Sequence, residues 1–248
     1  MIDEPVLRLT FSRDMNRVEE LDRRFYPDYV DEHVRFDGLI RRYLQPNANV
    51  LDAGAGHGAK YRFNYRGVVD RMVGVDVDPA VLDNPNLTHA VVSDLADLPF
   101  AEDEFDLVFS KYVFEHLERP EAVMRELRRV LKPDGHLLIH TPNRWHYVAL
   151  LAMLTPTRFH EWVVERQGRP HDHTFRTRYR ANDRKTLQQL AHSTGFRLLD
   201  LQRFETKPHY LFFHPWAYQA GIGYERLVNG FEPLAGLRGQ IFADLEVV

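Results

Sequence analysis

A glycine-rich turn that follows an acidic residue is the part of the chain whose residue types and spacing could do chemistry. Val50-Leu51 reads as the end of a buried strand, and Asp52-Ala53-Gly54-Ala55-Gly56-His57-Gly58 follows it directly. Glycine is needed where the backbone takes a positive φ or where a ligand presses against it. A strand, such a turn and then a helix form the usual cradle for a nucleotide-like cofactor at the carboxyl edge of a parallel sheet. We therefore expect a cofactor at this turn.

The charge at the turn distinguishes two classes of cofactor. Residues 54–59 satisfy the dinucleotide pattern G-x-G-x-x-G/A, which is a weak signal when it stands alone. In a dinucleotide site the turn receives a pyrophosphate, which the carboxylate of Asp52 would repel. S-adenosylmethionine has no phosphate and carries an ammonium and a sulfonium group, so an acid at the turn suits it. Asp52 therefore favours S-adenosylmethionine, and a nicotinamide dinucleotide stays the alternative.

Three later strand ends extend the predicted cofactor site. Asp76 ends a second buried strand about 20 residues after the turn, where a carboxylate can accept both ribose hydroxyls; a solvated loop acid is the other interpretation. Asp94 follows a short strand and could accept a hydrogen bond from the adenine amino group, with Leu95 on the ring. The exit of a strand over 104–110 would line the methionine half. The predicted cofactor-binding residues are Asp52, Ala53, Gly54, Gly56, Asp76, Val77, Asp94, Leu95, Ser110, Lys111 and Tyr112.

Together with Glu115-His116-Leu117 and the segment 131–135, these motifs occur in an order and spacing that resemble the class I S-adenosylmethionine-dependent methyltransferases, more narrowly their type 11 small-molecule group. The resemblance covers about residues 48–142 and is looser from 183 onward. It implies an α/β fold: a Rossmann-like doubly wound seven-stranded sheet with the last strand antiparallel. It also implies S-adenosyl-L-methionine at the ends of the first four strands, with S-adenosyl-L-homocysteine as product. Two segments depart from the pattern: 60–67 is aromatic and basic, and Pro79 with 84–86 shortens the next helix to one turn.

The elements that must position these residues divide the chain into four parts. Residues 1–47 form a helical segment, helical over 12–44, which covers the cofactor, so that Tyr26, Tyr29 and His33 lie over it or pack against the sheet. Residues 48–142 and 183–214 form the cofactor-binding core, and 215–248 form a helical tail. In the core we expect a helix over 121–131, a strand over 136–141, a helix over 183–194 capped by Asn182, and last strands over 196–204 and 209–213.

Residues 143–182 are too long for an ordinary strand-to-helix connection and are predicted to be an inserted helical cap that binds the acceptor. The segment has seven arginines against three acidic residues, a local charge of +4, with four histidines and six aromatic residues. Arginine forks match carboxylate and phosphate, so an anionic acceptor with an aromatic or apolar part is expected; solvated or paired arginines are the alternative. The predicted substrate-binding residues are Arg144, Trp145, Arg176, Arg178 and Tyr179.

Two apolar or aromatic stretches of the cap bear on the kind of acceptor. Residues 145–154 can form the wall of an apolar pocket, part of the core, or a helix at a membrane interface. Residues 141–144 with 158–162 look similar to methyltransferases of glycan and natural-product pathways, which implies an acceptor of that type.

Methyl transfer requires an aligned nucleophile and the removal of one proton, which histidine can accept at neutral pH. The candidate bases are His116, His146, His171 and His173. The pair His171 and His173 could also ligate a metal, but no carboxylate–histidine cluster at helical spacing accompanies it, so no metal is predicted. Oxygen is the favoured acceptor atom and nitrogen the alternative. A nicotinamide-dependent oxidoreductase and a non-catalytic S-adenosylmethionine-binding module are the competing functions.

Composition sets the remaining expectations. A chain of 248 residues that is 44% apolar can bury one sizeable core. It has no cysteine, and a formal charge of −4 does not suggest a nucleic-acid binder. The acidic amino terminus lacks a following apolar run, and the longest apolar stretch is too short to span a bilayer. We therefore expect a cytoplasmic protein with a small-molecule partner and no stable membrane insertion. Residues 211–224 can form a homodimer face or a further wall of the acceptor pocket.

Overall fold

The computed structural model describes residues 4–58, 63–154 and 176–248, which form two compact units. The first, here called the sheet unit, comprises Glu32–Arg144, Phe175–Arg203 and Gln240–Val248. The second, here called the helical unit, comprises Met1–Asp31, Trp145–Thr174 and Phe204–Gly239. Within the described ranges, every helix is too short or too polar to cross a bilayer.

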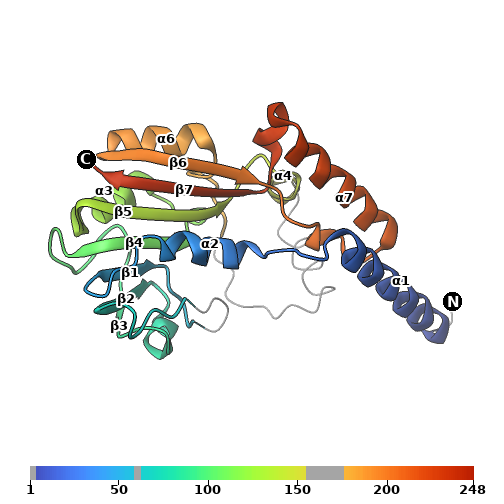
Figure 1. The fold of residues 1–248 in the computed structure, drawn as a ribbon, viewed down its shortest axis with the longest axis horizontal. Helices are drawn as coiled ribbons and strands as arrows, with labels where there is room; N and C mark the ends of the chain where they lie inside the picture. Colours follow the sequence, from blue (N-terminus) through green and yellow to red (C-terminus); the bar gives the residue numbers. More distant parts are fainter. Residues whose placement is uncertain (1–3, 59–62, 155–175) are drawn as a thin grey trace. The chain divides into compact units, whose positions relative to one another are not determined.

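A seven-stranded sheet with the order β3-β2-β1-β4-β5-β7-β6 dominates the chain (Figure 1). Strands β1 to β5 run parallel, whereas β7 is antiparallel to β5. The strand order reverses between β1 and β4, which is the switch point where ligands bind in open α/β sheets. The strands are β1 Asn49–Ala53, β2 Arg71–Asp76, β3 His89–Val92, β4 Phe105–Lys111, β5 Leu131–Pro142, β6 Phe196–Phe204 and β7 Gln240–Val247.

Helices α3 (Pro120–Val130) and α6 (Arg184–Ser193) cover one face of the sheet. On α3 the buried residues Val123, Met124, Leu127 and Val130 recur at helical spacing and join the core that includes Leu51 of β1. Pro120 is tolerated at the first turn of α3 because the amide it lacks has no partner inside the helix. These two helices bury one face of the sheet that carries the glycine turn at the end of β1.

Helix α2 (Glu32–Arg41) covers part of the opposite face. The ring of Phe36 lies 5.4 Å from that of His140 on β5 and 5.2 Å from that of Phe242 on β7. Successive side chains of a strand point to opposite faces, and the neighbours Ile139 and Ala243 accordingly belong to the core beneath α3 and α6. The sheet is therefore buried on both faces, which is why its central strands are almost continuously apolar.

The helical unit contains α1 (Glu4–Phe25), α4 (Tyr147–Leu154), α7 (Pro215–Gly230) and the 3₁₀ turns η2 (His209–Leu211) and η3 (Glu232–Leu237). Val18 and Leu21 of α1 pack on Tyr218 and Ile222 of α7. Asp22 accepts a hydrogen bond from the Tyr218 hydroxyl and forms an ion pair with Lys207 at 2.9 Å. An apolar contact, flanked by the partly buried Asp22, thus joins α1 to α7.

The fold class predicted from the sequence is confirmed, including the antiparallel last strand. Three local predictions were wrong. Residues 209–213 form η2 and not a strand, and the last strand of the sheet is β7 at 240–247. The helix over 12–44 is interrupted between Phe25 and Glu32. The predicted cap Asn182 is fully buried and donates to Thr141, whereas Asp183 caps α6 by accepting from the amide of Thr186.

The one-turn helix predicted after Asp76 is present as the 3₁₀ turn η1 (Pro79–Asp83). The predicted helix over 121–131 matches α3 with a shift of one residue, and the predicted strand over 136–141 lies within the longer β5.

Candidate functional site

The glycine turn after β1 is in contact with Val113 and is hydrogen-bonded to Val75. Gly54 has a φ of +92°, and an ideal Cβ there would overlap Cγ2 of Val113 and lie 3.3 Å from its Cβ. The amides of Gly54 and Ala55 both donate to the carbonyl oxygen of Val75, at 2.8 and 3.0 Å. Position 54 therefore requires glycine for two reasons, its backbone conformation and the lack of space.

Asp76, the last residue of β2, holds this turn in place. Its Oδ2 accepts from the amide of Gly56 at 2.9 Å and its Oδ1 from the amide of Asp78 at 2.9 Å. Each oxygen of a carboxylate has a second lone pair. The side chain can therefore accept further hydrogen bonds, such as those of ribose hydroxyls, while it orders the loop.

Asp52 and Asp76 form an electrostatically unfavourable pair at the carboxyl ends of adjacent strands. Burial and, second, the negative charge of Asp76 raise the pKa of Asp52 to about 8. Both effects disfavour the ionised carboxylate. At neutral pH Asp52 is therefore largely protonated; a bound cation would favour its ionised form, whereas a phosphate would add a negative charge beside Asp76. The acids of this turn therefore suit a cationic ligand.

Two asparagines brace the turn from outside. The side-chain amide of Asn84 donates to the carbonyl oxygens of Ala55 and Gly56 at 3.2 and 3.0 Å, and that of Asn86 donates to Gly58 at 3.0 Å. In the sequence these residues were read only as helix breakers. Two amide side chains flanking a proline, directly after a one-turn helix, are the signal that could have indicated their role.

The predicted adenine-binding residues have different surroundings. Asp94 is exposed; its Oδ1 accepts from the amide of Ala96 at 2.9 Å and its Oδ2 lies 3.7 Å from Nη2 of Arg119. Leu95 is 6% exposed and belongs to the core, while Val77 on the neighbouring strand end is exposed. Asp94 thus presents a carboxylate to solvent, and the side chain of Leu95 is largely enclosed by protein. Their contact with adenine stays a prediction.

The exit of β4 is buried and conformationally unusual. Ser110 Oγ donates to the carbonyl oxygen of Ala53 at 2.8 Å and so joins the ends of β4 and β1. Lys111 is 5% exposed, with Nζ 5.2 Å from the ring centre of Phe63 and 5.3 Å from that of Tyr112. Tyr112 has a φ of +55°, and non-glycine residues in this region cluster at functional sites. The role of these three residues beside the methionine half stays a prediction.

A buried polar group follows on β5. The Nε2 of His140 lies 2.9 Å from Oε1 of Gln240, and its ring is 4.5 Å from that of Tyr112. Burial and, second, the charge of Lys111 hold the pKa of His140 well below its usual value. The imidazole is therefore neutral and serves here as a partner for Gln240.

Glu115 is a further buried acid near this edge that the sequence reading did not select. Burial raises the pKa of its carboxyl to about 7, although the Thr141 hydroxyl donates to Oε2 at 3.2 Å. Asn182 donates to the same hydroxyl oxygen at 2.6 Å. The carbonyl oxygen of Glu115 accepts from the amides of Arg178 and Tyr179 at 2.6 and 3.1 Å. Glu115 thus ties the segment after residue 175 to the ends of β4 and β5.

The four candidate bases fall in three places. His171 and His173 lie outside the described residues. In the sheet unit, Nε2 of His116 is 3.9 Å from Oε1 of Glu115. In the helical unit, Nε2 of His146 is 3.2 Å from Oε2 of Glu205. Both described candidates therefore lie beside a buried carboxylate.

The predicted acceptor-binding residues differ in how far their charges are already paired. Nη2 of Arg178 lies 3.2 Å from Oε1 of Glu118, and Nη1 of Arg144 lies 3.9 Å from Oδ2 of Asp183. Arg176 and Trp145 are exposed, whereas Tyr179 is 9% exposed. Their roles in acceptor binding stay predictions, and Arg176 is the most open of these arginines.

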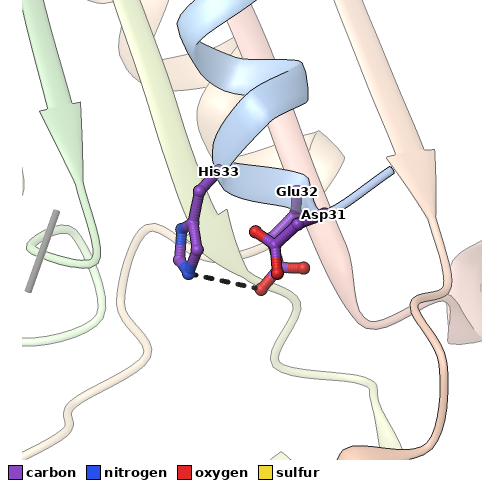
Figure 2. A group of neighbouring side chains, drawn as sticks. All are labelled: Asp31, Glu32 and His33. Atoms are coloured by element: carbon purple, nitrogen blue, oxygen red, sulfur yellow. Dashed lines mark ion pairs between the residues drawn. The ribbon is translucent and has the colours of Figure 1, made fainter. Parts of the chain in front are cut away.

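Asp31, Glu32 and His33 form a group of neighbouring acidic and imidazole side chains, shown in Figure 2. One ligand atom of each lies within 4.8 Å of the others, and Nε2 of His33 is 3.9 Å from Oε1 of Glu32. Such groups are common in proteins that bind no ion, and we assign no metal to this one. His33 instead lies edge-on to the ring of Tyr112, with 6.2 Å between ring centres.

Comparisons with known proteins bear on this site. Residues 51–139 match a family model described as a methyltransferase domain. This segment runs from β1 to β5 and contains the glycine turn with its three acids. The described turn thus lies within a sequence pattern of methyltransferases.

Two relatives and one solved structure extend the comparison. A protein of Encephalitozoon cuniculi whose name assigns it to the methyltransferases is 35% identical over 136 residues, covering 49% of this chain and 62% of that protein. The malonyl-[acyl-carrier protein] O-methyltransferase of Halorhodospira halophila is 31% identical over 156 residues, covering 56% and 49%. The chain thus spans about half to three fifths of these relatives.

The structure of the geranyl diphosphate C-methyltransferase of Streptomyces coelicolor A3(2), with Mg²⁺, geranyl diphosphate and S-adenosyl-L-homocysteine, has a TM-score of 0.53 at 13% identity. The match covers 90% of this chain and 84% of that one. At this identity the likeness shows a shared fold.

Proposed function

We propose that the chain is a class I S-adenosylmethionine-dependent methyltransferase that transfers a methyl group from S-adenosyl-L-methionine to an oxygen of a small anionic acceptor. The match of residues 51–139 to a methyltransferase-domain model and the methyltransferase relatives support this proposal. S-adenosyl-L-homocysteine is then the second product. When bound, the donor supplies a methyl group made electrophilic by its positively charged sulfur. What the protein adds is binding, orientation and the removal of one proton.

The observation that carries the proposal is the pairing of Asp52 with Asp76 at the glycine turn. Burial and the charge of Asp76 raise the pKa of Asp52 to about 8, so the turn disfavours further negative charge. A pyrophosphate would meet two acids there, which argues against the nicotinamide alternative. An ammonium or sulfonium group would be attracted by Asp76 and would favour the ionised form of Asp52.

In this proposal Asp76 accepts the ribose hydroxyls with the lone pairs that Gly56 and Asp78 leave open. Asp94 accepts from the adenine amino group with its exposed carboxylate. Gly54 gives the turn its positive φ and leaves room for Val113, and the backbone shaped in this way faces the amino-acid half of the donor. The core that holds the donor includes 48–142 and β7, and the segment 143–182 binds the acceptor.

The acceptor class rests on the composition of the segment 143–182, with its local charge of +4 and its aromatic residues. Arg176 is the exposed member of the arginines that are both predicted to bind the acceptor and described. A planar guanidinium recognises carboxylate or phosphate in bidentate fashion. We therefore propose an acceptor with an anionic group beside an aromatic or apolar part, of the kind found in glycan or natural-product pathways.

Calorimetry on the full chain tests the cofactor. We expect S-adenosyl-L-homocysteine to bind and NADH not to bind. Asp76→Ala should weaken S-adenosyl-L-homocysteine binding by about tenfold to a hundredfold, as expected for loss of one or two charge-assisted hydrogen bonds. Asp97→Asn, which changes an exposed acid of the neighbouring loop, is the matched control and should bind like the wild type. NADH binding in place of S-adenosyl-L-homocysteine would overturn the proposal.

Methyl transfer from radiolabelled S-adenosyl-L-methionine tests the acceptor class. Hydroxybenzoates and the corresponding neutral hydroxybenzamides form pairs of similar shape that differ in charge. We expect product from the acids and little from the amides, with the preference reduced by Arg176→Glu. Equal transfer to both members of each pair would refute the anionic acceptor. Cofactor binding without transfer to either class would favour a non-catalytic module.

A further inference from the structure

One face of α7 packs against the rest of the helical unit. Tyr218 and Ile222 lie in the contact with α1. Gly221 is equally enclosed, because an ideal Cβ there would lie 2.5 Å from Cβ of Pro208 and 2.9 Å from Cδ1 of Leu211. This face of α7 is therefore already in contact with its own chain.

A second face of α7 carries an exposed apolar stripe, here called the α7 stripe. Trp216, Ala220, Gly223 and Leu227 recur at intervals of four, three and four residues, which places them on one side of the helix. All four are exposed, Trp216 by 73% and Leu227 by 57%. Among the described residues, no atom lies within 4 Å of an ideal Cβ at Gly223. The α7 stripe thus has a large side chain at each end and small residues in the middle.

The charged residues beside the α7 stripe are engaged within the helical unit. Glu225 accepts a hydrogen bond from the Tyr26 hydroxyl at 3.3 Å and one from the side-chain amide of Asn229 at 2.7 Å. The guanidinium carbon of Arg226 lies 5.1 Å from the ring centre of Phe25. Helices that lie on anionic membranes are rich in lysine and arginine, whereas Arg226 is the single basic residue in the sequence of α7. The α7 stripe therefore suits an uncharged protein surface better than a lipid headgroup.

The apolar area exposed around the α7 stripe is sufficient for an interface. Phe213, just before α7, is 56% exposed, and Phe231, at its C-terminal cap, is 54% exposed. Together with Trp216 and Leu227 they expose on the order of 500 Å² of apolar surface per chain. Two such surfaces would bury on the order of 1,000 Å² in total, the lower limit for a specific protein–protein interface. This area fits a weak, reversible dimer.

The order of large and small residues in the α7 stripe is complementary to itself. In two antiparallel helices related by a two-fold axis between residues 221 and 222, Trp216 of one copy lies opposite Leu227 of the other, and Ala220 lies opposite Gly223. The spacing of four, three and four residues is that of the a and d positions of a coiled coil. Small central residues let the two backbones approach closely, and the large residues fill the space at each end.

We propose that the α7 stripe binds the α7 stripe of a second copy of this chain, forming an antiparallel homodimer. Of the two roles expected for residues 211–224, a homodimer face and a wall of the acceptor pocket, the exposure and the self-complementary order favour the first. The contacts that carry this proposal lie within the helical unit, so it stands independently of the proposed function.

Sedimentation equilibrium on the full chain measures the oligomeric state. We expect a mass of twice the 29.2 kDa of one chain, with dissociation on dilution through the micromolar range. Gly223→Glu places two carboxylates in the interface and should weaken dimerisation at least about a hundredfold. The space around Gly223 is open and glutamate favours a helix over glycine, so thermal melting should show an intact fold. Gly38→Glu, the same change at an exposed glycine of α2 with open space, is the matched control and should stay dimeric.

Disulfide cross-linking tests the antiparallel arrangement, because the chain has no cysteine of its own. A mixture of Trp216→Cys and Leu227→Cys copies should form a covalent dimer on mild oxidation, and each mixed pair keeps one unchanged Trp216–Leu227 contact. Trp216→Cys by itself should form far less covalent dimer. Its two cysteines would lie about 16 Å apart along antiparallel helices, beyond the reach of a disulfide.

Four results would overturn the proposal. A wild type that sediments as a monomer up to about 100 µM would mean that no second copy binds the α7 stripe. Such a monomer that also sediments with phosphatidylcholine vesicles would assign the α7 stripe to a lipid surface. A dimer that Gly223→Glu leaves unchanged would use another surface. Faster cross-linking of Trp216→Cys by itself than of the mixture would reject the antiparallel arrangement.

Discussion

Replacing Gly54 by alanine tests whether the glycine turn is shaped as described. Two separate costs apply to a Cβ at this position. A φ of +92° lies outside the left-handed region that L-residues tolerate, which costs about 1–3 kcal/mol. The overlap with Val113 Cγ2 adds a packing cost of about 1–3 kcal/mol. Gly54→Ala should therefore lower the free energy of unfolding by about 2–6 kcal/mol, a large share of the stability of a typical domain.

Urea unfolding of matched alanine variants separates the two costs. Gly56 has a φ of +50° and no atom within 4 Å of an ideal Cβ, so Gly56→Ala should cost only the backbone share, about 1–2 kcal/mol. Gly38 lies inside α2 with open space around it, and Gly38→Ala should stabilise by about 0.5–1 kcal/mol. Val113→Ala combined with Gly54→Ala should recover the packing share, seen as a coupling in a double-mutant cycle.

The refuting results are specific. Gly54→Ala with wild-type stability would mean that neither the φ nor the contact with Val113 is as described. A large loss without coupling to Val113 would leave the backbone strain and reject the overlap. Calorimetry on the variants that remain folded links the turn to function, because a distorted turn should also weaken S-adenosyl-L-homocysteine binding.

Three further predictions concern residues around the turn and the sheet edge. Glu115→Gln mimics the protonated acid. Folding raises the pKa of the Glu115 carboxyl from 4.5 to about 7, so the wild type should lose stability relative to the variant as the pH rises from about 4.5 to 7, by up to about 3 kcal/mol. A stability difference between the two proteins that is the same in urea unfolding at pH 5 and at pH 8 would contradict this. Asn182→Ala should cost about 1–3 kcal/mol because the buried Thr141 hydroxyl loses a hydrogen-bond donor. Asp183→Ala should cost about 1 kcal/mol because α6 loses its N-terminal cap. A larger loss for Asp183→Ala than for Asn182→Ala in urea unfolding would contradict this assignment. Asn84→Ala should weaken S-adenosyl-L-homocysteine binding about tenfold in calorimetry, and unchanged affinity would show that the turn does not need this brace.

Much of the sheet unit was predictable because its signals are local. A buried apolar run that ends in Asp52 or Asp76 predicts a parallel strand with an acid at its carboxyl end, whatever the rest of the chain does. The short helix after Asp76 followed from Pro79 and from 84–86, because proline restricts the residue before it. These predictions rest on backbone geometry and on burial pattern, both of which a few neighbouring residues express.

The last strand and the cap of α6 were mispredicted for a physical reason. Residues 209–213 are aromatic and apolar enough for a strand, yet they form η2, while 240–247 pairs with β5. Which of two apolar segments takes the position between β5 and β6 is decided by packing and register over long sequence distances. Likewise Asn182 and Asp183 are both good cap residues, and only the buried hydroxyl of Thr141 draws Asn182 away from the helix end.

What the sequence by itself determined is the cofactor turn: the order of Asp52, Gly54, Gly56 and Asp76 specified a strand, a positive φ and two converging acids. What only the tertiary structure decided is which groups meet across the chain. Glu115 meets Thr141 and Thr141 meets Asn182 over separations of 26 and 41 residues, and His146 meets Glu205 over 59 residues. The spacing of residues in a short motif determines local backbone conformation. A contact between side chains that are distant in the sequence depends on how whole helices and strands pack, and a short motif does not specify that packing.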